Sequence, residues 1–292
     1  MVSANTPVSL NDGNTIPWLG FGTGSALYTK DAEALVASAI KLGITHLDGA
    51  QAYANEDSLG SGLVSSGVPR SKLFVTTKLG KLSDGQSVRD AFVGSLKKLK
   101  LDYVDLFLIH NPIFFPGEGA LKKIWKELEG LKKEGLAKSI GVSNSNISNL
   151  KEILDGATIV PAVNQVEFHA HDYEEFKPLL EFQAKHKIVT QSYGGLSPLF
   201  RVPNSPVVPV VTDIAAAKSK AIGRTVTNNQ VLGLWLWAKG VVAITTSTKP
   251  ERVSEYLAIE GVPALTDEEV AAIDAAGAKE HDRHFFKYEP SA

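Results

Sequence analysis

The 292-residue sequence contains no cysteine, which excludes disulfide bonds, thiolate metal sites and thiol catalysis. It also lacks an excess of charge of either sign. The formal net charge is −2, which argues against binding to nucleic acid or membrane surfaces through bulk electrostatics. We therefore predict no metal, nucleic-acid or membrane partner, and nothing in the sequence implies a protein partner.

Long apolar runs are missing as well. The most apolar region, residues 231–246, contains Lys239 and does not reach the roughly 18 residues that a membrane-spanning helix needs. The first residues have neither the positive charge nor the apolar stretch of a secretory signal. We therefore expect a cytoplasmic protein.

No Gly-x-Gly-x-x-Gly opens a βαβ unit, so a Rossmann dinucleotide site is not supported. The sequence instead alternates short β-branched apolar runs with longer segments of helical periodicity. The convincing helices cover residues 31–42, 86–99, 119–133 and 173–186, and Gly43 and Gly135 stand where left-handed helix ends are expected. The strand candidates lie near residues 18–22, 45–48, 73–78, 103–109, 138–142, 162–166, 188–192 and 241–245.

Eight buried strands alternating with helices predict an α/β fold, a (β/α)8 barrel, as one domain over residues 1–292. Residues 8–16 carry the turn Asp12-Gly13 between two β-type segments and predict a leading hairpin. Residues 191–227 contain four prolines in their first part, and we expect a long irregular functional loop there.

Four polar residues fall at the ends of consecutive predicted strands. Asp48 ends the second, Tyr53 follows it, Lys78 ends the third and His110 ends the fourth. Each alone has an ordinary structural explanation, but in a barrel all four project toward the same mouth. Reduction of a carbonyl by hydride leaves negative charge on oxygen, which needs a proton donor and polar partners. A nearby ammonium is expected to lower the tyrosine pKa from about 10.

The segment His46-Leu47-Asp48-Gly49-Ala50-Gln51-Ala52-Tyr53, with Lys78 and His110, resembles the catalytic tetrad of the aldo-keto reductases. The resemblance covers nearly the whole chain. It implies that Tyr53 is the general acid, that Lys78 and Asp48 tune it, and that His110 orients the carbonyl. Further cofactor contacts implied by the resemblance are Gly22 and Thr23 near the nicotinamide, and Ser143, Asn144 and Gln165 on its carboxamide.

The resemblance also implies a stacking residue and a phosphate site. In the run 192–198, whose register is open by one residue, we favour Tyr193 over Ser192 for stacking, followed by Gly194, Leu196 and Ser197 around the pyrophosphate. After the eighth strand a helix start rich in hydroxyls and cations suits a phosphomonoester. Thr245, Thr246 and Tyr256 depart from the usual motif, yet NADPH (NADP) is the expected cofactor, held by Thr246, Ser247, Thr248, Lys249, Arg252 and Glu255.

Two large rings of many relatives are replaced here, by Gly24 and Asn111, which predicts a wider substrate pocket. Phe285, Phe286 and Tyr288 are expected to supply an aromatic wall. The motif and loop resemble a fungal subgroup that reduces α-dicarbonyls and conjugated polyketones, so a small-molecule carbonyl is the expected substrate. A nicotinamide-binding regulatory subunit and a Schiff-base lyase using Lys78 remain alternatives.

Overall fold

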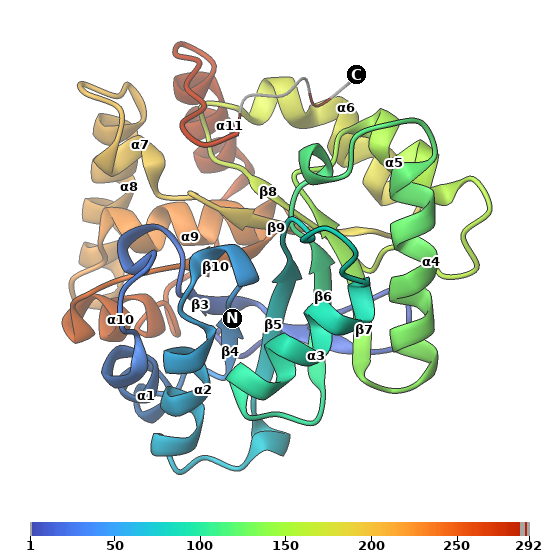
Figure 1. Cartoon of the computed structure of the whole chain (residues 1–292). Helices are drawn as coiled ribbons and strands as arrows, with labels where there is room; N and C mark the ends of the chain where they lie inside the picture. Colours follow the sequence, from blue (N-terminus) through green and yellow to red (C-terminus); the bar gives the residue numbers. More distant parts are fainter. Residues whose placement is uncertain (1, 287–289, 291–292) are drawn as a thin grey trace.

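Eight parallel strands form a closed barrel at the centre of the computed structural model, which describes residues 2–286 and residue 290 (Figure 1). Around the barrel the order is β10-β3-β4-β5-β6-β7-β8-β9, so the last strand pairs with the first. Each strand bound lies within one residue of the predicted bound, and the (β/α)8 fold is confirmed. The strands are β3 Leu19–Gly22, β4 His46–Asp48, β5 Phe74–Leu79, β6 Val104–Ile109, β7 Ala137–Ser143, β8 Val163–Glu167, β9 Val189–Tyr193 and β10 Val242–Thr245.

Helices surround the barrel and include the four predicted ones. Gly43 follows the first predicted helix with φ +118°, and Gly135 lies just beyond the third predicted helix with φ +78°, both in the left-handed region expected for a helix end. The helices are α1 Glu33–Leu42, α2 Glu56–Ser65, α3 Val88–Leu99, α4 Ala120–Lys133, α5 Ile147–Leu154, α6 Tyr173–Lys185, α7 Ser197–Phe200, α8 Val207–Ile222, α9 Asn228–Ala238, α10 Pro250–Leu257 and α11 Asp267–Gly277, with short 3-10 turns η1 Ser25–Leu27, η2 Gln51–Tyr53, η3 Arg70–Lys72 and η4 Pro112–Phe114.

The predicted hairpin is confirmed as β1 Pro7–Ser9 and β2 Thr15–Pro17, with Val8 opposite Ile16. Ile16 is fully buried. It belongs to a compact apolar cluster with inward-facing strand residues, among them Leu106, Leu108 and Val163. The hairpin therefore packs against the side chains that fill the barrel, and the functional cavity lies at the carboxyl ends of the strands.

The expectation of one long irregular loop over residues 191–227 was wrong. The segment contains α7 and α8. Residues without helix or strand structure are confined to short stretches before α7, between α7 and α8, and after α8. Pro206 is the N-cap residue of α8 and Pro209 lies in its first turn. A backbone N–H in the first turn has no partner within the helix, so proline is tolerated there. From the sequence the prolines predict a loop, although Pro206 and Pro209 lie at the start of α8.

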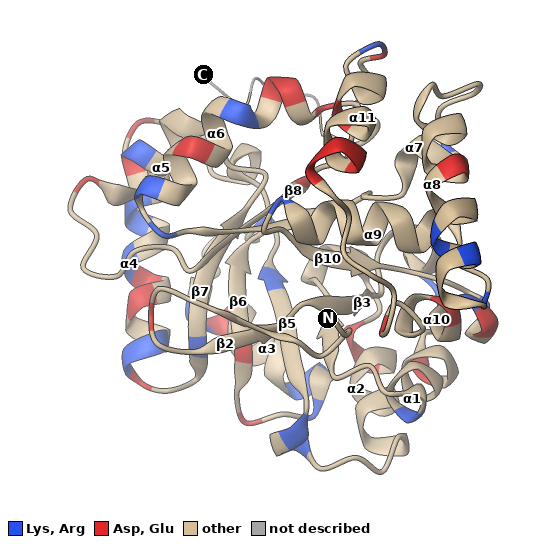
Figure 2. Ribbon diagram, turned by 180° about the vertical axis from the view of Figure 1, so that it is seen from behind, with Lys and Arg blue, Asp and Glu red and all other residues tan. Residues whose placement is uncertain are grey.

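Charged residues lie mostly on the outer helices and loops (Figure 2). Lys78 on β5 is an exception, because its side chain is fully buried. Within the described part of the chain, no helix combines the length and apolar character needed to cross a bilayer. The same residues contain no group of three His, Asp or Glu side chains placed to hold a metal ion.

Candidate active site

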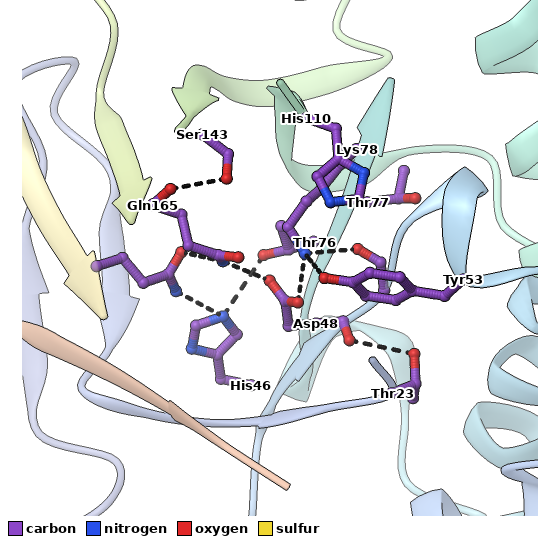
Figure 3. Close-up of polar contacts among 12 residues, drawn as sticks. Thr23, His46, Asp48, Tyr53, Thr76, Thr77, Lys78, His110, Ser143 and Gln165 are labelled. Atoms are coloured by element: carbon purple, nitrogen blue, oxygen red, sulfur yellow. Dashed lines mark hydrogen bonds and ion pairs between the residues drawn. The ribbon is translucent and has the colours of Figure 1, made fainter. Parts of the chain in front are cut away.

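A cavity of about 530 Å³ lies at the carboxyl ends of the strands. Asp48, Tyr53 and His110 line it, and Lys78 contacts the first two from the barrel interior. The four residues come from the end of β4, from η2, from β5 and from the residue after β6. The structure thus brings the four predicted residues together (Figure 3). Much of the remaining wall is aromatic and comprises Tyr28, Phe114, Tyr193, Phe285 and Phe286.

The Lys78 ammonium is surrounded by three acceptors. It donates to the Asp48 carboxylate, to the Gly49 carbonyl oxygen at 2.9 Å and to the Tyr53 hydroxyl oxygen at 3.2 Å. An ammonium has three N–H donors, so all three are used. The Tyr53 oxygen is an acceptor toward Lys78, which leaves its own proton to be donated elsewhere.

Burial changes the acid–base balance expected from the sequence. Burial raises the pKa of Tyr53 above its ordinary value and outweighs the opposing effect of Lys78, so the expected net lowering was wrong. For Lys78, burial acts to lower the pKa, but the attraction of Asp48 and Tyr53 together raises it. At neutral pH the site therefore holds a phenol beside an ammonium.

His110 presents a neutral ring to the cavity. Burial, with a smaller contribution from Lys78, lowers its pKa to about 3. Its ring lies edge-on to Tyr53, with 5.4 Å between centroids. Its backbone carbonyl accepts from the Asn144 side chain at 2.9 Å, and its buried Nδ1 has no hydrogen-bond partner among the described residues. A neutral imidazole carries one N–H and can donate it to a substrate oxygen.

A chain of side chains inside the barrel holds Asp48 from the other side. Gln165 Nε2 donates to Asp48 Oδ2 and to Gln191 Oε1, both at 2.7 Å. Gln191 Nε2 lies 3.5 Å from His46 Nε2, and His46 Nδ1 lies 3.1 Å from the Pro17 carbonyl oxygen. Burial lowers the pKa of His46 to about 4, so the ring is neutral and accepts from Gln191 while donating to Pro17. This chain of side chains was not predicted from the sequence, although strand alternation places both glutamines inside the barrel.

Several predicted cofactor residues meet in the same cavity: Gly22, Ser143, Asn144, Gln165, Tyr193, Gly194 and Thr246. The Tyr193 hydroxyl donates to Asn144 Oδ1 at 2.7 Å, and Ser143 Oγ donates to the Gln165 carbonyl oxygen at 2.7 Å. Ser192 is fully buried and donates to the Phe168 carbonyl oxygen. The alternation of β9 therefore puts Tyr193, and not Ser192, in the cavity wall.

A second hollow of about 390 Å³ continues from the first and shares Gly194, Thr246 and Phe285 with it. Two buried hydroxyl oxygens, Ser197 Oγ and Thr246 Oγ1, have no hydrogen-bond partner among the described residues. Leu196 and Arg252 line this hollow as well. Sequence reasoning missed two further polar residues there, Ser25 and Arg201, because both lie in short turns without a motif.

Other predicted contacts lie apart from both cavities. Thr23 Oγ1 is buried and donates to the Asp48 carbonyl oxygen at 3.3 Å. Glu255 accepts from Thr227 and Asn229 and so ties α10 to the start of α9. Ser247 Oγ accepts from the Lys249 backbone N–H, while Thr248 and Lys249 are exposed. Asn111 lines a neighbouring hollow and caps η4 through the Ile113 N–H at 3.0 Å.

The sequence pattern of the aldo/keto reductase family matches residues 18–278. The chain belongs to this family. It is 37% identical over 284 residues to the NAD/NADP-dependent indole-3-acetaldehyde reductase of Schizosaccharomyces pombe, covering 94% of this chain and 97% of that protein. It is 35% identical over 272 residues to the methylglyoxal reductase DkgA of Escherichia coli, covering 92% and 94% of the two chains. A crystal structure of a Bombyx mori aldo-keto reductase in complex with NADP superposes with a TM-score of 0.81 at 30% identity, covering 94% of each chain.

In this aldo/keto reductase Gly24 packs directly against Tyr53. A Cβ added to Gly24 would lie 2.8 Å from Tyr53 Cζ, closer than side-chain atoms approach. A larger residue therefore needs movement of the backbone or of the Tyr53 ring. The wider pocket expected from Gly24 stays a prediction. Phe285 and Phe286 line the cavity, in agreement with the predicted aromatic wall. Tyr288 lies outside the described residues.

Gly24→Ala is expected to lower kcat roughly ten- to a hundredfold, because Tyr53 is the predicted general acid and small displacements of such a group are costly. The Kd for NADPH should change little. Gly94→Ala is the matched control, since a Cβ on that α3 glycine meets nothing within 4 Å. Steady-state kinetics and cofactor titration of both variants check this. Unchanged kcat in Gly24→Ala would mean that Tyr53 tolerates the added methyl group.

Proposed function

We propose that this aldo/keto reductase uses NADPH to reduce aldehydes or ketones, of α-dicarbonyl or conjugated polyketone type, to alcohols with Tyr53 as general acid. The observation that carries the proposal is the saturation of Lys78. Its three donors serve Asp48, Gly49 and Tyr53, so the Tyr53 proton is available to the cavity. A general acid must lie within hydrogen-bond reach of the oxygen that it protonates, and the cavity offers that position.

Features of the two hollows support a dinucleotide. The unpartnered buried oxygens of Ser197 and Thr246 fit the hydrogen-bonding needs of a phosphorylated ligand. Tyr193 would support the nicotinamide ring, Ser143, Asn144 and the Gln165 oxygen its carboxamide, and Arg252 the 2′-phosphate. When bound, NADPH supplies hydride to the carbonyl carbon. The similar Schizosaccharomyces pombe reductase is NAD/NADP-dependent by name, and the similar Bombyx mori enzyme was crystallised in complex with NADP, which supports the same cofactor here.

The reaction assigns different work to each member of the tetrad. The substrate oxygen would bind between the Tyr53 hydroxyl and the neutral His110 ring, which fixes the carbonyl orientation. Tyr53 then transfers its proton to that oxygen as negative charge develops there. The Lys78 ammonium stabilises the tyrosinate that remains, and Asp48 and Gly49 hold the ammonium in place.

The lining of the cavity supports a dicarbonyl substrate. The cavity of about 530 Å³ has to hold the nicotinamide ring as well as the substrate, so the support comes from its aromatic rings, which suit a flat conjugated ketone. One similar protein is named for methylglyoxal, which is an α-dicarbonyl. The Thr245-Thr246-Ser247 motif and the Tyr193 loop resemble the dicarbonyl-reducing subgroup. A screen of NADPH oxidation against aldehydes, α-diketones, isatin-like ketones and lactones tests the proposal, which fails if no carbonyl accelerates oxidation.

The two alternatives have less support. A Schiff-base lyase needs a neutral, accessible lysine, whereas Lys78 is fully buried and its pKa is raised by Asp48 and Tyr53 against the effect of burial. A regulatory subunit without turnover would not require that Asp48, Tyr53, Lys78 and His110 be assembled at one cavity. A mass increase after borohydride treatment with an aldehyde would support the lyase instead.

Arg252→Ala should weaken NADPH binding by about one to two decades and leave NADH almost unchanged. Arg252 lines the second hollow, and its guanidinium carbon lies 5.3 Å from the centroid of the Phe200 ring. NADH has no 2′-phosphate for Arg252 to contact, so its binding should not depend on this residue. Thr246→Lys should hold or tighten NADPH binding. Fluorescence titration of both cofactors measures the effect, with the exposed Arg89→Ala on α3 as the control. Equal weakening of both cofactors would assign Arg252 to support of the local structure.

A further inference from the structure

The aromatic wall of the cavity includes the chain segment that follows α11. Phe285 and Phe286 both line the cavity. The Phe285 ring meets the Tyr193 ring edge-on, with 5.3 Å between centroids, and the Arg201 guanidinium lies 4.9 Å from the Phe285 centroid. Phe285 thus sits between the proposed nicotinamide-stacking ring and a cation of the second hollow. Its position decides how much of the cavity a substrate can use.

A single buried carboxylate fixes the backbone of this segment. Glu167, the last residue of β8, accepts the His284 N–H on one oxygen at 2.8 Å and the Phe285 N–H on the other at 2.9 Å. The Glu167 side chain is fully buried. These two hydrogen bonds join residues more than a hundred positions apart. They link a barrel strand to a segment without helix or strand structure.

A histidine and two backbone N–H groups compensate the burial of Glu167. His169 Nε2 lies 3.7 Å from Glu167 Oε1 and equally far from Asp172 Oδ2, and the His169 side chain is fully buried. Burial alone would raise the pKa of Glu167, but His169 and the two backbone N–H groups lower it below its ordinary value. A buried carboxylate with such partners stays ionised, and hydrogen bonds to an ionised group are stronger than neutral ones. Arg283 secures the same segment by donating to the Phe286 carbonyl oxygen at 2.7 Å.

We propose that Glu167 is a positioning residue for substrate selection, which holds Phe285 against the cavity by binding the backbone of residues 284 and 285. Glu167 does not line the cavity, so it acts through Phe285 and does not touch the reacting atoms. Substrates large enough to contact the Phe285 ring depend on this clamp, and a small α-dicarbonyl does not. The inference rests on the proposed carbonyl reduction.

The test is a double-mutant cycle with Glu167→Gln and Phe285→Ala. A glutamine keeps one acceptor oxygen, but its NH2 group faces a backbone N–H that it cannot bind. We expect Glu167→Gln to raise KM for isatin, a bicyclic dicarbonyl, about tenfold, and to change kcat/KM for methylglyoxal less than about twofold. Phe285→Ala should act in the same way, and the double variant should lose no more than Phe285→Ala alone. The proposal would be overturned if the effects of the two substitutions on KM multiplied in the double variant, or if each substitution lowered kcat/KM equally for isatin and for methylglyoxal.

A second measurement does not depend on turnover. Trypsin cleavage after Arg283, followed by mass spectrometry, should be about tenfold faster in Glu167→Gln than in the wild type, because the segment opens more often. An unchanged cleavage rate would overturn the clamp, even if no carbonyl substrate were reduced. Glu181→Gln, an exposed glutamate on α6, is the matched control. If Glu167→Gln does not fold, Glu167→Asp keeps the charge, withdraws the carboxylate by one methylene and takes its place in both measurements.

Discussion

Tyr53→Phe is expected to lower kcat/KM for carbonyl reduction by about 10²- to 10⁴-fold, the range typical of losing a general acid. The substitution removes one oxygen and keeps the ring. The ring contacts that surround Tyr53 should survive, including the edge-on contact with His110 at 5.4 Å and the Lys78 ammonium 4.8 Å from the ring centroid. The Kd for NADPH should therefore stay close to the wild-type value.

Tyr28→Phe is the matched control for that experiment. Tyr28 lines the same cavity, and its ring centroid lies 6.3 Å from that of Tyr53, but its side chain is half exposed and no ammonium contacts its hydroxyl group among the described residues. It should retain nearly full activity. A Tyr53→Phe enzyme with more than about a tenth of wild-type kcat/KM would remove Tyr53 from the acid role.

The sequence predicted those features that local pattern determines. Strands buried on both faces are continuous β-branched runs, and all eight were found within one residue. A polar residue at a strand end needs only the strand bound to be placed, so the sequence correctly placed Asp48 and His110 at the cavity and Lys78 beside Asp48. The prolines before and within α8 misled, because they are equally compatible with a loop and with a helix start.

Features that depend on packing between distant segments could not be predicted. The hydrogen bonds from Gln165 to Asp48 and from the Phe285 N–H to Glu167 each span more than a hundred residues of sequence. The sequence around Gln165 and Glu167 contains no pattern that predicts either hydrogen-bond partner. The pKa of Tyr53 was misjudged for a related reason. The sequence spacing predicts that Lys78 lies near Tyr53 and lowers its pKa. The burial that raises this pKa by more is produced by the packing of the whole barrel.

Lys78→Met is expected to reduce kcat/KM about a hundredfold or more, because the tyrosinate left after proton transfer loses its ammonium partner. Its pH profile should change as well. Reduction needs the phenol form of Tyr53, so the rate falls as pH rises through the Tyr53 pKa. Lys78 acts to lower that pKa against the effect of burial. Without the ammonium, the pKa rises further and the alkaline decline moves to higher pH.

The same substitution leaves the Asp48 carboxylate buried without its cation, with Gln165 as a remaining side-chain donor. An unpaired buried charge of this kind destabilises a protein by about 3–5 kcal/mol. Asp48→Asn combined with Lys78→Met removes both charges, so it should recover most of the free energy of unfolding without recovering activity. Denaturant unfolding and the pH profile of kcat/KM for the three proteins separate the two effects. If Lys78→Met kept the wild-type rate and profile, Lys78 would serve only to stabilise the barrel, and Tyr53 would need another partner for its charge.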